Sequence, residues 1–211
     1  MQLPVGTILL ILVAILVYFG VLHRVLDRMR LSDTAALVIV ILMAAGTFLD
    51  IPVSGGNIPV RINAGGAIVP LGVVIWLVAT ADDASEKARS VFSILATGVV
   101  VWGLTKVLNP DEQFMRWSPM LVFGIAAGII AALSGRSRRA AFAGGVGGVL
   151  VADIIHWIEL VARRMPGSVA FGGAGTFDTT VIAGILAVGL VELVGEARER
   201  VVKTSGGRQG R

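Results

Sequence analysis

The sequence predicts an all-α membrane protein, a polytopic bundle of about seven transmembrane helices. Of its 211 residues, 55% are hydrophobic and only 15% are charged, and the mean hydropathy is +0.86. A soluble domain carries about 25% charged and 45–50% apolar residues. The 27 glycines agree with this class, because small residues let transmembrane helices approach closely.

Seven apolar runs are the candidate membrane spans, since a helix needs about 20 apolar residues to cross the hydrocarbon layer. The runs cover residues 4–22, 34–52, 65–80, 91–108, 120–135, 140–162 and 175–194. The start, MQLPVGTILL, lacks the basic segment of a signal peptide, so we expect a retained first helix. We predict a membrane domain over 1–195 and a polar, basic tail over 196–211 that loses order after one or two turns.

The lysines and arginines predict the orientation of the chain. Thirteen of the eighteen lie on one side of the predicted spans, near residues 24–30, 87–89, 136–139 and 198–211, and five lie on the other side. The positive-inside rule then places the N-terminus outside and the C-terminus in the cytoplasm. Because these residues occupy short loops, the net charge of +4 reflects membrane orientation and not a nucleic-acid-binding face.

Two segments, residues 50–79 and 153–188, resemble each other. Each starts with Asp-Ile near the outer end of a helix, continues through a loop with Pro and Arg, and reaches Gly-Gly-Ala before an inward-running helix. If the two segments are a repeat, helices one to three form one unit and helices five to seven form a second, parallel unit. Helix four joins the two units, which gives a 3+1+3 plan with Gly-rich helix breaks. Transporters built this way bind substrate between the repeats. Chance similarity is the alternative in a glycine-rich chain.

Asp153, His156 and Glu159 follow one side of the sixth predicted helix, because they are spaced by three residues. A charge at the bilayer centre costs about 2.5–3.5 kcal/mol, so the deep Asp153 needs a partner or a purpose. Glu159 is near enough to the outer end to snorkel and to pair with Arg163 or Arg164.

His156 fits three roles: a proton relay with Asp153, a metal ligand, or a hydrogen-bonded helix contact. The only other histidine, His23, belongs to the opposite membrane face. We therefore predict no metal site. The glycines of GGVGG (144–148) lie within the same predicted helix and are interpreted as a close-packing face, not a phosphate-binding loop.

A glycine string that includes Gly172 and Gly173 leads to Asp178 at the start of the last predicted helix. Asp178 fits a helix cap or first-turn acid. Irregular backbone at membrane depth, however, occurs only where it is buried in protein or lines a wet cavity. A Gly-rich approach to a helix N-terminus also directs backbone N–H groups at an anion. Cap, ion ligand and catalyst all remain open for Asp178.

The matching stretch of the first half is INAGGAIVP (62–70). It places Asn63 before Gly65 and Gly66, and it puts Pro70 inside a predicted helix. A proline there frees a backbone carbonyl, which must be satisfied or used. Broken helices near buried acids are typical of ion or substrate sites. The predicted binding residues are Asp50, Asn63, Gly65, Gly66, Asp153, His156, Gly172, Gly173 and Asp178.

INAGGAIVP, the ADII of residues 152–155 and the GGAGTFD of residues 172–178 resemble the signature segments of the domain-of-unknown-function 1614 family of bacterial and archaeal multi-pass membrane proteins. The resemblance runs from about residue 50 through the last helix. Thr179-Thr180 stands where the family is expected to have a glycine after the aspartate. The resemblance implies an architecture in the cell membrane of a prokaryote, and no reaction.

Three functions follow from these residues. The first is a transporter or channel for an ion or small solute, with Asp153 and Asp178 as cation or proton sites. The second is an intramembrane aspartyl protease with an Asp153/Asp178 pair, although Asp178 follows Gly175 by three residues, unlike the G-x-G-D of presenilin-like proteases. The third is a structural or assembly role without turnover.

The expected partners are the lipid bilayer and an ion or small solute. We expect no nucleic acid, and a homo-oligomer is compatible with the sequence. The chain has no cysteine and no nucleotide-binding, haem or zinc motif, so no cofactor is expected.

Overall fold

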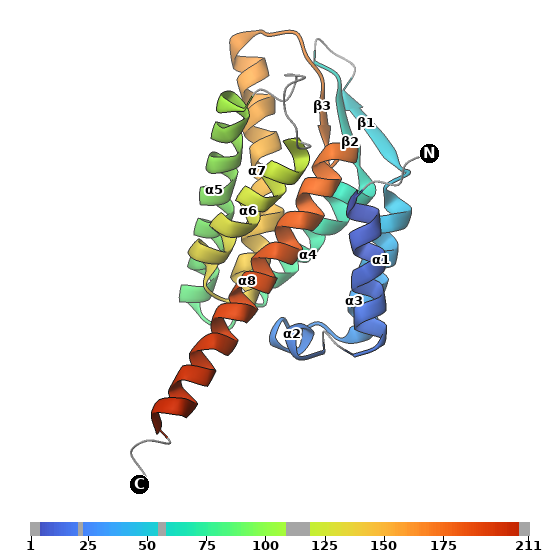
Figure 1. Cartoon of the computed structure of the whole chain (residues 1–211). Helices are drawn as coiled ribbons and strands as arrows, with labels where there is room; N and C mark the ends of the chain where they lie inside the picture. Colours follow the sequence, from blue (N-terminus) through green and yellow to red (C-terminus); the bar gives the residue numbers. More distant parts are fainter. Residues whose placement is uncertain (1–4, 21–22, 55–57, 109–118, 207–211) are drawn as a thin grey trace.

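The computed structural model describes residues 5–20, 23–54, 58–108 and 119–206, and it is 78% helical (Figure 1). The elements in chain order are α1 (Val5–Tyr18), α2 (His23–Arg28), α3 (Asp33–Gly46), β1 (Asp50–Ser54), β2 (Val60–Asn63), the π-helix η1 (Ala64–Ile68), α4 (Val69–Ala79), α5 (Ala84–Val107), α6 (Pro119–Gly135), α7 (Arg138–Arg163), β3 (Val169–Phe171) and α8 (Ala174–Gly206).

The helices form two groups. In Figure 1, α4 to α8 make a bundle, and α1 and α3 lie together at its side, with α2 at the end away from the strands. We call α1, α2 and α3 the N-terminal hairpin. The end of the helices that carries the strands is the sheet end, and the opposite end is the α2 end. The hairpin packs on α8 through Leu10, Val40, Met43 and Val181.

Apolar helices occur at all seven predicted positions. Two of them, α5 and α7, are long and apolar enough to cross a membrane. The other apolar helical stretches in the described part of the chain have 10–17 residues: Ile8–Tyr18 of α1, Asp33–Gly46, Ala64–Ala79 (η1 with α4), Pro119–Gly135 and Thr179–Gly195 of α8. The apolar runs therefore located the apolar helices, and in the described part of the chain α5 and α7 are the two that are both long and apolar enough for a full span.

Glycines of α7 bring the helices of the bundle into close contact. A Cβ on Gly148 would lie 2.5 Å from Cβ of Thr97 on α5, and a Cβ on Gly145 would lie 2.9 Å from the carbonyl oxygen of Ala183 on α8. Real Cβ atoms essentially never approach closer than 3.0 Å. The interpretation of GGVGG as a close-packing face is confirmed, because no larger residue fits these contacts.

A three-stranded sheet departs from the all-α expectation. β1 pairs antiparallel with β2, and β2 pairs parallel with β3. The predicted second span, 34–52, was too long at its end, since α3 ends at Gly46 and β1 begins at Asp50. The alternation of Val60-Arg61-Ile62-Asn63 is typical of a strand, here the central one. Pro52 lies in the edge strand β1, and Pro59 precedes β2, where a proline is tolerated.

The last helix is longer than predicted. α8 continues to Gly206, about three turns beyond the expected end at residue 194, and it projects past the bundle at the α2 end (Figure 1). The residues involved, GEARERVVK, are mostly strong helix formers.

The repeat stays a prediction. Its two segments do share one feature, because β2 runs into η1 and α4 while the parallel β3 runs into α8. They differ in that β1 and β2 form a hairpin, whereas β3 follows α7 without such a partner among the residues that the structure describes.

Candidate functional site

The two glycine motifs predicted from the sequence meet at the sheet end. A Cβ on Gly66 would lie 2.0 Å from the carbonyl oxygen of Gly172, and a Cβ on Gly172 would lie 2.2 Å from the carbonyl carbon of Gly66. On its other side, η1 touches the end of α3, where a Cβ on Gly65 would lie 2.1 Å from the carbonyl oxygen of Met43. Three backbone segments therefore cross here without side chains between them. We call Gly46, Gly65, Gly66 and Gly172 the glycine crossing.

Asn63 ties this crossing together. Its side chain is buried, and Nδ2 donates to the carbonyl oxygen of Thr47 at 2.8 Å and to Oδ1 of Asp50 at 2.9 Å. Its Oδ1 accepts from the backbone N–H of Gly66 at 2.8 Å, which caps η1. Asp50 lies opposite Asn63 in the β1–β2 pairing. The structure thus brings Asp50, Asn63, Gly65, Gly66 and Gly172 to one place, with Gly173 one residue further along the chain.

The predicted helix break is a π-helix. From Ala64 to Ile68 the backbone takes the wider π form, and the N–H of Val69 donates to the carbonyl oxygen of Ala64. Pro70 follows in the first turn of α4 and is buried. Such π segments frequently occur at functional sites.

The acidic stripe on α7 divides into separate environments. Asp153 is half-buried and His156 is exposed. The carboxylate of Glu159 binds Nζ of Lys106 at 2.5 Å, Nη1 of Arg163 at 3.3 Å and Nε1 of Trp102 at 3.1 Å. The predicted Glu159–Arg163 pair is therefore present, and Glu159 joins α7 to α5.

The predicted Asp153/Asp178 pair lies partly outside the described residues. The backbone of Asp178 lies in the first turns of α8, but its side chain lies outside the described residues. Among the side chains that the structure describes, no three His, Asp or Glu residues are grouped as metal ligands.

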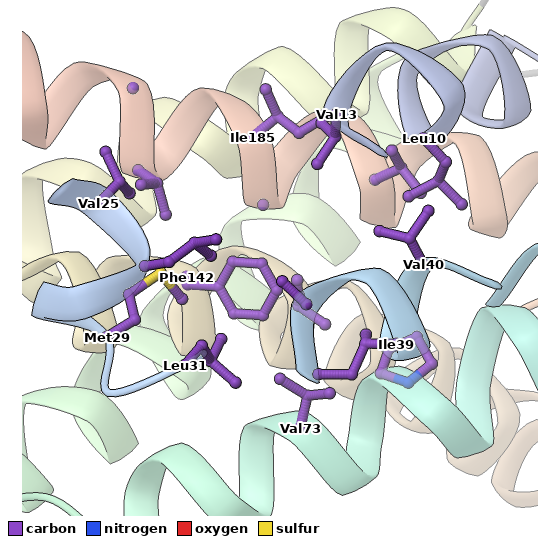
Figure 2. A pocket seen from close by; sticks show the side chains of 18 of the residues that line it. Leu10, Val13, Val25, Met29, Leu31, Ile39, Val40, Val73, Phe142 and Ile185 are labelled. Carbon is purple, nitrogen blue, oxygen red and sulfur yellow. The ribbon is translucent and has the colours of Figure 1, made fainter. Parts of the chain in front are cut away.

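An apolar cavity of about 510 Å³ lies between the N-terminal hairpin and the bundle. Figure 2 shows side chains of α1, α2, α3, α4, α7 and α8 around it, with the ring of Phe142 among them. Its lining is almost wholly aliphatic, and Thr180 and Glu192 are among its few polar residues. None of Asp50, Asn63, Asp153 and His156 lines it. Its volume is in the range of about 300–1,000 Å³ found for ligand sites.

The sequence-based prediction missed this cavity because it rested on polar residues. The one available signal is on α8, where two rows with a spacing of four residues face the cavity: Thr180, Gly184, Val188 and Glu192, and Val181, Ile185, Gly189 and Leu193. Residues at this spacing share one helix face. Because each row contains a glycine, this face of α8 leaves a space unless a neighbouring helix packs into it.

Charged side chains gather at the α2 end of the cavity. Arg138 pairs with Glu192, and Arg30 pairs with Oδ1 of Asp82. Arg139 is only 4% exposed; its Nη1 lies 3.7 Å from Oδ2 of Asp82, and its Nη2 donates to Oγ1 of Thr80 at 2.7 Å. Its Nε and Nη1 have no hydrogen-bond acceptor among the described residues. We call Arg30, Asp82, Arg138, Arg139 and Glu192 the charged cluster.

The fold and the cavity define a helical bundle with two membrane-capable helices and an apolar cavity between two helix groups. The chain belongs to a family described as "Protein of unknown function (DUF1614)", whose model matches residues 20–190. This confirms the family resemblance found in the sequence, over most of the chain. No curated protein and no solved structure matches it.

Proposed function

We propose that this protein is a multi-pass membrane transporter for a small solute with a large apolar part, and that the solute occupies the cavity beside the N-terminal hairpin. The observation that carries the proposal is the cavity itself, which is apolar, elongated and bounded by two helix groups. Carriers need such a site between parts that can move relative to each other.

The outer surface of the bundle supports a membrane location. On α5, the large apolar residues Phe92, Leu95 and Val99 are 62%, 54% and 55% exposed along one face. The opposite face of α5 buries small and polar residues, including Ser93 and Thr97. Apolar residues outside and small residues inside are typical of helices packed in lipid.

The full topology belongs to the same proposal. The seven apolar helices cross the cell membrane of a prokaryote, with the N-terminus outside and the α2 end in the cytoplasm. The distribution of basic residues supports this orientation, because the α2 end carries Arg30, Lys87, Arg89, Arg136, Arg138 and Arg139, and the sheet end carries Arg61, Lys106, Arg163 and Arg164. The lipid bilayer is then the main partner of the chain.

The glycine crossing is the pivot in this proposal. Backbone contacts and the bonds of Asn63 hold α3 against η1 at the sheet end. Towards the α2 end, the cavity lies between the hairpin and α8, beside a buried cluster in which Met29 packs with Val73 and Leu77 of α4. A hinge at the sheet end would therefore open and close the cavity at the α2 end, as domain motions about fixed contacts do.

The lining also decides between an ion and an apolar solute. A bare ion would lose its hydration in the cavity without gaining ligands, which is costly. Glu192 is the one ionisable residue among the lining residues, and it already pairs with Arg138. The predicted ligands Asp50 and Asn63 bind each other at the glycine crossing and have a positioning role for the hinge.

Distance measurements between spin labels test the proposed motion, and the cysteine-free chain needs no prior engineering. One doubly labelled variant, Val38→Cys with Val194→Cys, reports the α2 end. A matched variant at the sheet end, Phe48→Cys with Ala170→Cys, reports the pivot. All four positions are exposed.

In lipid nanodiscs we expect at least two distance populations for the Val38/Val194 pair and one for the Phe48/Ala170 pair. A single narrow distance at both ends, in bilayers of several lipid compositions, would refute a transporter that works by hairpin motion.

A further inference from the structure

The cavity is long and narrow, and its length follows from the residues that line it. Thr180 and Leu193 on α8 mark its two ends. They are 13 residues apart, which is about 20 Å along a helix. A volume of about 510 Å³ spread over this length is too narrow for an α-helix, which is about 10–12 Å across with its side chains. The shape instead fits one extended hydrocarbon chain.

The cavity has different chemistry at its two ends. At the sheet end it is closed by buried Pro70 and Met43, next to the glycine crossing. At the α2 end, Leu193 is 65% exposed, so the cavity opens there along the edge of α8. Ligand can therefore enter from the membrane at the end where the polar head of an amphiphile would meet water.

The charged cluster sits at this opening, and Glu86 lies beside it, because its Oε1 accepts from Oγ of Ser137 and its Oε2 accepts from the backbone N–H of Asp82. The three arginines of the cluster face two carboxylates, those of Asp82 and Glu192. Arg30 is the exposed arginine of the cluster, and it stands between two cavity-lining residues, Met29 and Leu31. A guanidinium in that position can exchange its partner for an anionic head group, because arginine binds carboxylates in a two-pronged geometry.

We propose that the cavity holds the tail of a long-chain carboxylate, with its head group at Arg30. The inference rests on the proposed function in that it takes the same cavity as the ligand site, and it names the class of ligand. The apolar lining supplies affinity for the tail. The exposed guanidinium of Arg30 selects an anionic head over a neutral one of the same length.

The experiment measures saturable binding of radiolabelled hexadecanoate to the purified full-length chain in zwitterionic nanodiscs, with hexadecanol as the uncharged comparison. Gly189→Phe fills the cavity, since Gly189 lines it and a Cβ added there would meet nothing within 4 Å. Gly72→Phe is the matched control, because Gly72 is equally open on α4 and does not line the cavity.

For the head group, Arg30→Gln is compared with Lys87→Gln, which removes one exposed positive charge outside the cluster. We expect Gly189→Phe to weaken both ligands by at least about tenfold. We expect Arg30→Gln to weaken hexadecanoate alone by about tenfold, as for the loss of a charged hydrogen bond. Both controls should bind like the natural chain.

Absence of saturable hexadecanoate binding would overturn the inference, as would equal effects of Gly189→Phe and Gly72→Phe. Equal binding of the alcohol and the acid, unchanged by Arg30→Gln, would refute the anionic head. The proposed function fails separately, through the spin-label distances. Binding without hairpin motion would leave a lipid-binding protein, and motion without binding would leave a transporter for another solute.

Discussion

Substitution of Gly172 by alanine tests the glycine crossing most directly. The new Cβ would lie 2.2 Å from the carbonyl carbon and 2.6 Å from the carbonyl oxygen of Gly66. Because real Cβ atoms keep at least 3.0 Å from their neighbours, one backbone must move by nearly 1 Å. The movement cannot be taken up by a side-chain rotation, since the atoms in contact are all main-chain atoms.

The expected loss of stability has two parts. Overpacking a tight contact costs about 1–3 kcal/mol. Gly172 also has a φ of +64°, and a left-handed backbone costs a residue with a Cβ about 1–2 kcal/mol. We therefore expect Gly172→Ala to lower the free energy of unfolding by about 2–5 kcal/mol. The control Gly72→Ala should be neutral or stabilising by up to about 1 kcal/mol, because its Cβ meets nothing within 4 Å.

Denaturant unfolding in detergent micelles, followed by tryptophan fluorescence, measures both variants against the natural chain. Gly66→Ala combined with Gly172→Ala should cost less than the two single changes added together, because the two glycines touch and one shift of the backbone relieves both clashes. If Gly172→Ala and Gly72→Ala unfold alike, the close backbone contact is wrong.

Two further predictions concern Asn63 at the sheet end and His23 at the α2 end. Asn63→Ala should lower the free energy of unfolding by about 1–3 kcal/mol, because the buried backbone groups that Asn63 binds lose their partners; a change below about 0.5 kcal/mol in the same denaturant assay would contradict this. The pKa of His23 is raised above its ordinary 6.5 by its hydrogen bond to Asp33 and by the charges of Asp27 and Asp33. Since the folded pKa exceeds the unfolded one, this contribution to stability is present below about pH 6.5 and lost as the pH rises through the folded pKa. The unfolding temperature of the natural chain should thus exceed that of His23→Gln at about pH 5.5, and the two should converge at about pH 8.5. A difference in unfolding temperature that does not change with pH would show that the charge on His23 does not cause it.

Local patterns in the sequence were enough to locate most elements. Apolar runs predicted the apolar helices to within a few residues, except where α3 gives way to β1 at Asp50, where α5 begins at Ala84, and where α8 continues past residue 194. The short α2 lies in none of the predicted runs. The INAGGAIVP stretch was recognised as unusual backbone because glycines and an internal proline disfavour a regular helix, and the structure has a π-helix there. In GGAGTFD only Gly172 and Gly173 precede the regular helix α8, which begins at Ala174. Pairing of Glu159 with Arg163 followed from their spacing of four residues on one helix.

What the sequence by itself determined is the partition of the chain into apolar helices and irregular Gly-rich breaks, because hydrophobicity and backbone preference act over a few neighbouring residues. The tertiary structure alone decided that Gly66 meets Gly172, that β2 pairs with β3, and that a cavity lies between the hairpin and α8. These features depend on contacts between segments about 100 or more residues apart. The residues that line the cavity are also ordinary aliphatic ones, and only their packing separates them from the apolar residues on the outside of the bundle.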